Sequence, residues 1–170
     1  MTGKTLFVLG GARSGKSSFA LRRAEALPGP HIFIATAETY DDEMRDRVAR
    51  HRDERGPQWA TVEAPLDLPK AILSQHGGGG VLLVDCLTLW TSNLLLAERD
   101  IGAATQALCA AIIGHDAHII LVSNEVGLGI VPENALARRF RDEAGRMNQA
   151  IAAMVDEAVF VAAGLPLQLK

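Results

Sequence analysis

The chain has 170 residues, a size that suits one domain with its own hydrophobic core. Its net charge of −3 and its eight aromatic residues argue against a general nucleic-acid surface, because such surfaces combine basic stripes with stacking rings. No apolar run is long enough to span a membrane, and the apolar start is too short for a secretory signal. The two cysteines, Cys86 and Cys109, lack a metal-binding spacing. We therefore expect one cytoplasmic domain, residues 1–170, with two buried, unreactive thiols.

The first part of the chain predicts strands and helices in alternation. The apolar run TLFVLG (5–10) ends in glycines and suits a buried strand, and residues 16–26 predict a helix that stops before a Pro-Gly-Pro turn. HIFIATA (31–37) predicts a second buried strand. The charged, helix-prone segment 41–55 and a short strand at 60–64 follow.

The middle of the chain continues the alternation. A short helix is predicted at 67–75, and the four glycines at 77–80 predict a flexible turn that ends it. VLLVD (81–85) predicts a third fully buried strand. Two helical segments, 87–98 and 102–115, come after it.

The last part predicts buried strands at 118–124 and 158–164, separated by the longest helix, 133–157, and a short final strand within 166–170. The apolar residues of that helix follow steps of three and four, at Leu136, Phe140, Ala144, Met147, Ile151 and Met154. Strands that are apolar throughout and separated by helices indicate an α/β fold. Its sheet is expected to be mostly parallel, with helices on both faces.

The segment GGARSGKS (10–17) matches the phosphate-binding pattern G-x-x-x-x-G-K-[ST], with Gly10, Gly15, Lys16 and Ser17 at its fixed positions. It also lies between a predicted strand and a predicted helix, as the pattern requires. Glycines let successive backbone N–H groups turn inward around phosphate oxygens, and the helix start adds about half a positive charge. Lys16 is expected to reach the β- and γ-phosphates, and the Ser17 hydroxyl to hold Mg²⁺.

Asp85 ends the apolar run 81–85, which is the usual place for the acidic partner of the metal in a P-loop fold. The alternative is that Asp85 caps the helix that follows. We expect the metal role, so the sequence predicts binding of a nucleoside triphosphate with Mg²⁺.

One histidine, His51, lies inside a basic cluster with arginines at positions 45, 47, 50, 52 and 55. Cationic neighbours disfavour the imidazolium and lower the pKa of the histidine from its reference value of about 6.5. A neutral imidazole is a nucleophile that could attack a phosphorus atom held by arginines and form a phosphoramidate. An inert histidine on a solvated face is the simpler interpretation, and these residues alone do not decide between the two.

Several motifs together resemble one family, the bifunctional adenosylcobinamide kinase / adenosylcobinamide-phosphate guanylyltransferases of cobalamin biosynthesis, along essentially the whole chain. The phosphate loop alone is shared by many families, whereas HR-x-x-R-x-x-x-W-x-T-x-E and NEVG-x-GIVPE together are quite specific. The motifs are GGARSGKS, IATAETYDDEM (34–44), RVARHRDER (47–55), W-x-T-x-E (Trp59, Thr61, Glu63), VDCLTLW (84–90) and SNEVGLGIVPENALARRFRDEAGRMNQ (123–149).

The resemblance implies two reactions. In the first, ATP or GTP gives its γ-phosphoryl group to the aminopropanol hydroxyl of adenosylcobinamide. In the second, His51 attacks the α-phosphorus of GTP, pyrophosphate leaves, and the GMP on His51 passes to adenosylcobinamide phosphate to give adenosylcobinamide-GDP. Lys16, Mg²⁺ and the arginines could neutralise the phosphoryl charge in both steps.

The resemblance also implies a RecA-like P-loop fold, a homotrimer and a set of nucleotide-binding residues. One departure from the family is that Gly56 stands where members usually have Pro, and Pro57 follows, so we expect a changed turn there. By position, the nucleotide contacts are Gly10, Gly11, Ala12, Arg13, Ser14, Gly15, Lys16, Ser17, Ala35, Thr36, Ala37, Arg52, Asp53, Glu54, Arg55, Glu63 and Asp85.

Two other functions are compatible with the phosphate loop: a P-loop small-molecule kinase in which His51 is inert, and a non-catalytic nucleotide-binding switch. The segment 124–149 is also open. It could line the corrinoid site or pack between subunits, or Pro132 and Glu133 could simply start a helix. Asn124 and Glu125 follow a strand end and could face the nucleotide. No catalytic base is assigned.

Overall fold

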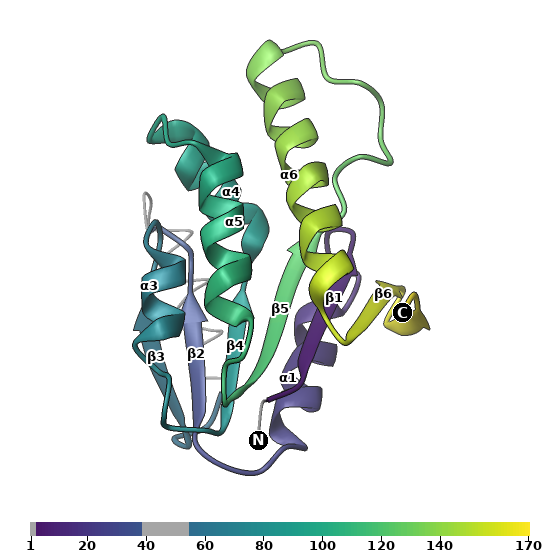
Figure 1. Cartoon of the computed structure of the whole chain (residues 1–170). Coiled ribbons are helices and arrows are strands. Elements are labelled where there is room, and N and C mark those ends of the chain that lie inside the picture. The colour runs from purple at the N-terminus through teal and green to yellow at the C-terminus, as the bar shows by residue number, and fades with distance from the viewer. Residues whose placement is uncertain (1–2, 39–54) are drawn as a thin grey trace.

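A central sheet of seven strands organises the part of the chain that the computed structural model describes, residues 3–38 and 55–170 (Figure 1). The strand order is β3-β2-β4-β5-β1-β6-β7, and every neighbouring pair is parallel except β6 with β7. The strands are β1 (Thr5–Gly10), β2 (His31–Ala35), β3 (Trp59–Glu63), β4 (Val81–Asp85), β5 (His118–Asn124), β6 (Glu157–Ala162) and β7 (Leu165–Gln168).

Helices cover both faces of this sheet (Figure 1). Among the described helices, α1 (Lys16–Glu25) packs on one face, where the sheet contributes residues such as Val8, Leu83 and Ile120. On the other face, strand residues with the opposite parity pack against α3 (Leu68–Leu73), α4 (Leu87–Leu96), α5 (Ile101–Ile112) and α6 (Ala135–Met154). The predicted α/β class with a mostly parallel, doubly covered sheet is therefore confirmed. No described helix is both long and apolar enough to cross a bilayer.

Two predicted strands end earlier than the apolar pattern suggested. The strand expected at 31–37 ends at Ala35, and Thr36 instead uses its side chain to bond the backbone of Cys86. The strand expected at 158–164 ends at Ala162, because Ala163 and Gly164 have φ angles of 52° and 77° and turn the chain into β7. The helix predicted at 41–55 lies outside the described residues, apart from Arg55, which is not helical.

The long helix α6 begins two residues later than predicted. Pro132 and Glu133 do not start it; Asn134 is the N-cap, and its side-chain oxygen accepts hydrogen bonds from the N–H groups of Leu136 and Ala137 at 2.8 and 3.2 Å. Within the predicted apolar stripe, Ala144, Met147 and Ile151 are buried, whereas Leu136 at the start of the helix is 50% exposed.

The four-glycine turn before β4 is held in place by one carboxylate. Asp116 accepts hydrogen bonds from the N–H groups of Gly77 and Gly79 at 3.0 and 2.9 Å, and these bonds lower the pKa of its carboxyl group. Gly77, Gly79 and Gly80 all have positive φ, which explains the need for glycine. The predicted turn at 77–80 is thus present, and hydrogen bonds to Asp116 hold its backbone in place.

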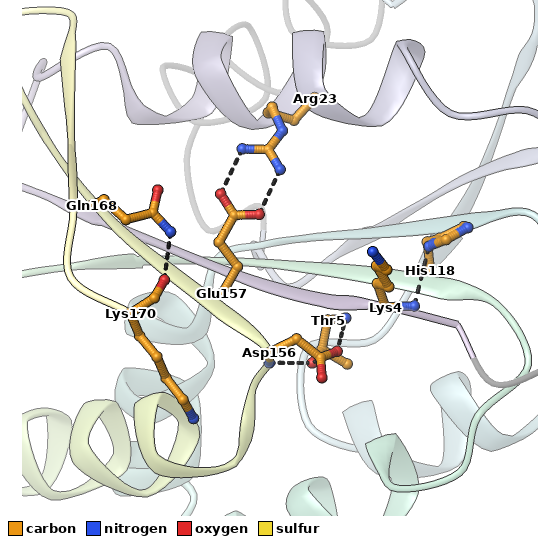
Figure 2. Close-up of polar contacts among 8 residues, drawn as sticks. All are labelled: Lys4, Thr5, Arg23, His118, Asp156, Glu157, Gln168 and Lys170. Atoms are coloured by element: carbon orange, nitrogen blue, oxygen red, sulfur yellow. Dashed lines mark hydrogen bonds and ion pairs between the residues drawn. The ribbon is translucent and has the colours of Figure 1, made fainter.

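A polar clamp joins the amino-terminal ends of β1 and β6 to α1 (Figure 2). Arg23 of α1 donates two hydrogen bonds to the two carboxylate oxygens of Glu157, at 2.9 and 2.7 Å. Asp156 accepts from both the N–H and the hydroxyl of Thr5, and its own N–H donates back to the Thr5 hydroxyl. The hydrogen bonds from Arg23 lower the pKa of Glu157, and those from Thr5 lower the pKa of Asp156.

This clamp predicts an acid-dependent loss of stability. Because the pKa of Glu157 is lower in the folded state than in the unfolded state, its contribution is complete above the unfolded pKa of about 4.3 and is lost as the pH falls through the folded pKa. We expect Glu157→Gln to lower the free energy of unfolding by roughly 0.5–1 kcal/mol at pH 7, since the pair is partly exposed.

Urea unfolding at several pH values measures this effect. The difference between the original chain and Glu157→Gln should shrink steadily below about pH 4. Glu98→Gln, at an exposed position without an ion pair in the described part of the chain, is the matched control and should show no such trend. A Glu157→Gln deficit that is constant with pH would contradict the assignment.

Candidate active site

The segment 10–17 forms a tight loop between β1 and α1, and close packing explains two of its glycines, Gly10 and Gly15. A Cβ atom on Gly10 would lie 2.5 Å from the Ser14 hydroxyl oxygen and 2.6 Å from the carbonyl oxygen of Val161. Gly15 directly precedes the helix with φ of 90°, a left-handed conformation that favours glycine. The N–H of Glu125 donates to the Gly10 carbonyl at 3.1 Å and ties the loop to the end of β5.

Lys16 lies over this loop. Its side-chain nitrogen donates to the carbonyl of Gly11 at 3.0 Å, and the residue is only 9% exposed. The first turn of α1, all of it described, carries no acidic side chain and no side-chain cap, so its N–H groups can receive an anion. Ser17 lies partly buried in this turn, while Ala12 and Arg13 are exposed on the loop.

The turn between β6 and β7 braces the loop from the far end of the chain. The N–H of Gly164 donates to the Ser14 carbonyl at 2.7 Å, and a Cβ atom on Gly15 would lie 3.1 Å from the Gly164 Cα. Sequence reasoning missed this contact. The only signal was a glycine directly after the last long apolar run, which does not reveal its partner.

Three predicted nucleotide-binding residues form one row across the sheet. The register pairs Ala35 of β2 with Glu63 on one side and with Asp85 on the other. Phe33 and Leu83, two residues earlier on their strands, belong to the α1 face, so strand alternation places this row on the α1 face as well. The strand ends therefore present two carboxylates on the face where loop 10–17 leads into α1.

Asp85 does not cap the helix that follows it. The N-cap of α4 is Cys86, and no side chain caps that helix. The alternative interpretation of Asp85 is therefore wrong, and its carboxylate stays available at the strand end. Burial raises the pKa of the neighbouring Cys86 thiol to about 11, in line with the prediction of an unreactive thiol. Cys109, the other cysteine, is only partly buried.

Thr36 belongs to the opposite face and is engaged in structure. Its hydroxyl donates to the Cys86 carbonyl at 2.7 Å and accepts from the Cys86 N–H at 2.8 Å. Asn93 of α4 donates to the carbonyls of Thr36 and Pro65 at 2.8 and 3.0 Å. This network fixes the loops after β2, β3 and β4 relative to one another. Ala37 follows, partly buried, close to the end of the first described range.

Arg55 is the first residue described after residue 38, and it is buried. Its guanidinium carbon lies 3.4 Å from the centre of the Phe33 ring, a cation–π geometry on the α1 face. The changed turn expected at Gly56 is a tight one, in which the N–H of Trp59 donates to the Gly56 carbonyl at 3.3 Å. The predicted residues His51, Arg52, Asp53 and Glu54 lie outside the described part of the chain.

A separate group of possible metal ligands, His76, His115 and Asp116, lies at the amino-terminal edge of the sheet, away from loop 10–17. Both ring nitrogens of His115 are already engaged, Nδ1 with the N–H of Ala117 and Nε2 with the carbonyl of Ile72, each at 3.1 Å. Asp116 holds the glycine turn. These contacts explain the cluster as a structural one.

Comparison with known proteins decides between the remaining functions. The family model described as cobinamide kinase / cobinamide phosphate guanyltransferase matches residues 6–169. The chain belongs to this family. Its two activities, kinase and guanylyltransferase, are therefore those of this chain, and they serve adenosylcobalamin biosynthesis. The prediction of a bifunctional enzyme is confirmed, and a kinase without guanylyl transfer and a non-catalytic switch are both set aside.

Two curated relatives support the assignment over nearly their whole lengths. The chain is 47% identical over 165 residues to the bifunctional adenosylcobalamin biosynthesis protein CobP of Pseudomonas aeruginosa, covering 96% of this chain and 95% of that protein. It is 42% identical over 183 residues to the bifunctional adenosylcobalamin biosynthesis protein CobU of Salmonella typhimurium, covering 97% and 99%.

Solved structures confirm the fold. The flagellar accessory protein FlaH of Methanocaldococcus jannaschii superposes with a TM-score of 0.56 at 12% identity, covering 99% of this chain and 79% of that one. A prototypical ATPase of a bacterial type III secretion system gives a TM-score of 0.60 at 11% identity, covering 98% and 58%. At such identities the likeness concerns the fold alone, which is the predicted RecA-like P-loop fold.

Proposed function

We propose that loop 10–17 and the strand-end row bind the nucleotide with Mg²⁺, and that His51 carries GMP between GTP and the corrinoid. In the kinase step, ATP or GTP gives its γ-phosphoryl group to the aminopropanol hydroxyl of adenosylcobinamide. In the transferase step, a nitrogen of His51 attacks the α-phosphorus of GTP and pyrophosphate leaves. The phosphate of adenosylcobinamide phosphate then displaces His51, which gives adenosylcobinamide-GDP.

The observation that carries this proposal is the shared face of the site. Loop 10–17, the start of α1 and the carboxylates of Glu63 and Asp85 all belong to the α1 face at the carboxyl ends of the strands. Ligands of open α/β sheets collect at this edge. The loop N–H groups and Lys16 favour phosphate oxygens, and Arg55, the last residue of the His51 motif 47–55, also packs on this face.

The residues present fit a magnesium ion. Mg²⁺ prefers oxygen ligands and is usually bound by one or two side-chain oxygens together with substrate phosphates. Ser17 supplies a hydroxyl in the first turn of α1, and Asp85 supplies a carboxylate on the same face. When bound there, the ion would neutralise charge on the phosphate oxygens. Removal of divalent ions with a chelator is expected to stop phosphorylation of the corrinoid.

Product analysis tests the order of the two reactions. With adenosylcobinamide and ATP alone, mass spectrometry should show adenosylcobinamide phosphate and nothing further. Addition of GTP should convert it to adenosylcobinamide-GDP with release of pyrophosphate. Formation of the GDP product without GTP, or no phosphorylated corrinoid with either nucleotide, would contradict the proposal.

We also propose that residues 1–170 act as one cytoplasmic domain that assembles into a homotrimer. A closed ring requires two different complementary patches on each subunit. Two exposed apolar surfaces are available. One consists of the loop residues Leu128, Ile130 and Val131 with Leu136, and the other of Leu165 and Leu167 on the edge strand β7 with Leu169 directly after it. Exposed apolar surface of this kind is typical of protein interfaces.

Replacing Ile130, which is 97% exposed, with Asp is expected to weaken this assembly, because the charge would be buried in the interface. Sedimentation should show a species of three times 18.2 kDa for the original chain and a shift toward 18.2 kDa for the variant. Ile113→Asp is the matched control, since Ile113 is also exposed but belongs to neither surface. An original chain that sediments as a monomer would rule out the trimer.

A further inference from the structure

Asn124 lies beside the phosphate loop, at the end of the strand next to β1. β5 runs between β1 and β4, and the register pairs Asn124 with Gly10. Ile120 and Val122 of the same strand pack on the α1 face, so alternation places the Asn124 side chain on that face too. Asn124 therefore extends the row of strand ends toward the first glycine of the loop.

The backbone of Asn124 is held from the opposite face by buried hydrogen bonds. Its N–H donates to the Thr88 hydroxyl at 2.7 Å, and its carbonyl accepts from the Asn148 side chain at 3.2 Å. The oxygen of the Asn148 side chain accepts from the Ser123 hydroxyl at 2.7 Å. Thr88, Ser123 and Asn148 are all at most 7% exposed. Residues from α4, β5 and α6 thus fix the position of one residue at the site.

The side chain of Asn124, in contrast, makes no hydrogen bond to any residue that the structure describes. Its oxygen Oδ1 is buried and accepts no hydrogen bond within the described part of the chain. A buried carbonyl oxygen without a donor is rare and carries a desolvation cost. Here it lies beside the buried polar groups of Thr88, Ser123 and Asn148, which all have hydrogen-bond partners. Each such atom in a folded protein needs an explanation, and a catalytic role is one of the known ones.

The chemistry of this oxygen limits what the partner can be. A carboxamide oxygen only accepts hydrogen bonds, so its partner is a donor. Phosphate oxygens only accept and do not fit. The ammonium group of Lys16 already donates to Gly11 and is expected to turn to the phosphates. The donors that remain in the site include the Ser14 hydroxyl, whose oxygen also has no partner in the described part of the chain, the hydroxyl group of the acceptor and an ordered water. Of these, only the acceptor hydroxyl takes part in the reaction.

We propose that Oδ1 of Asn124 accepts a hydrogen bond from the acceptor hydroxyl that attacks the γ-phosphorus. Asn124 is then a further catalytic residue of the kinase step, and this inference rests on the proposed binding of the nucleotide at loop 10–17. The ligand class is an alcohol, whose O–H points at Asn124 while an oxygen lone pair points at phosphorus. The rigid backbone of Asn124 gives this orientation its precision.

The step balances without a base from Asn124. The bond from the hydroxyl oxygen to the γ-phosphorus forms, and the bond from that phosphorus to the β–γ bridging oxygen breaks. The nucleoside diphosphate leaves with the electron pair. An amide oxygen is too weakly basic to take the proton, so the proton passes to solvent and Asn124 acts by orientation alone.

Asn124→Ala tests the proposal in the full chain with adenosylcobinamide and GTP. The kcat of phosphorylation should fall about 100-fold, the size of effect that misplacement of a reacting group produces. The Kd of GTP should stay within about threefold, and labelling of the protein by α-phosphate-labelled GTP should persist, because neither involves the acceptor hydroxyl. The Tm should not fall, because the lost oxygen has no partner to lose.

A second variant and a control separate catalysis from structure. Asn124→Asp keeps an acceptor oxygen, so it should retain at least about tenfold more kcat than the alanine variant while binding GTP more weakly, since it adds charge beside the phosphates. Thr105→Val removes a buried hydroxyl of α5 that donates to Ile101, far along the chain from the site. It should lower the Tm and leave kcat unchanged.

Three outcomes would overturn the inference. The first is an unchanged kcat in Asn124→Ala. The second is an equal loss of phosphorylation and GMP labelling together with a lower Tm, which would indicate a structural role. The third is recovery of kcat at high Mg²⁺, which would show that the oxygen binds a metal-bound water. Failure of the proposed function is distinguishable, because the original chain itself would then phosphorylate no corrinoid.

Discussion

Replacing His51 with Asn is expected to abolish the covalent attachment of GMP to the protein. The proposed intermediate joins the α-phosphorus of GTP to a ring nitrogen, and an asparagine amide is not a nucleophile that could replace it. After incubation with α-phosphate-labelled GTP and denaturation, the original chain should carry label that is lost in acid and stable in base. The variant should carry none.

Phosphorylation of adenosylcobinamide by ATP provides the internal control for this variant. That step does not use His51, so its kcat should stay within a few-fold of the original. His76→Asn is the matched histidine control, because His76 is exposed at the amino-terminal edge of the sheet, away from loop 10–17. It should leave the labelling intact. Label that survives in His51→Asn would show that another group carries GMP, and an unlabelled original chain would remove the covalent step altogether.

Replacing Lys16 with Ala is expected to lower the kcat of phosphorylation by a factor of about 10²–10³ or more. Removal of one preorganised donor from a site where charge develops has effects of this size. Lys16 is nearly buried over the loop, so its positive charge acts in a poorly solvated environment. In the alanine variant, water would stabilise the phosphate charge less well than the ammonium group does. The Kd of the nucleotide should rise as well, as titration calorimetry can measure.

Lys4→Ala is the control for this experiment, because Lys4 is an exposed lysine at the amino-terminal end of β1, the strand that carries the loop at its other end. It should leave kcat and nucleotide affinity unchanged. Turnover of Lys16→Ala near that of the original chain would show that loop 10–17 is not the working nucleotide site. A thermal melt of each variant separates loss of function from loss of folding.

Local patterns were sufficient for most of the fold. β1 and β4 have the predicted limits, 5–10 and 81–85, because a run that is apolar throughout fits only a position buried on both faces. The loop 10–17 was equally readable, since Gly10 and Gly15 each answer a steric demand at a fixed spacing. Helix ends were harder to predict than strand limits. The proline signal favoured a start of α6 at Pro132 and Glu133, but the side chain of Asn134 caps the helix instead.

Short-range signals also explain where the candidate site could not be read. Asp85 stands out in the sequence, because an acid directly after an apolar run is unusual. Ala35 and Thr36 are neighbours at the end of one predicted strand, 31–37, yet they belong to opposite faces. Only the observed end of β2 distinguishes the two residues, because it places Ala35 in the row of strand ends and Thr36 in the buried hydrogen-bond network. A shift of one residue in a strand reverses the face of every side chain.

The sequence by itself determined the alternation of elements, the phosphate loop and the family, because periodicity and motif spacing are local along the chain. Tertiary structure decided the strand order, the brace of Gly164 on Ser14 and the isolation of the Asn124 side-chain oxygen. Each of these features depends on residues that are far apart in sequence. Parallel strands are paired only after intervening helices close long loops, and no local pattern specifies which strands will become neighbours.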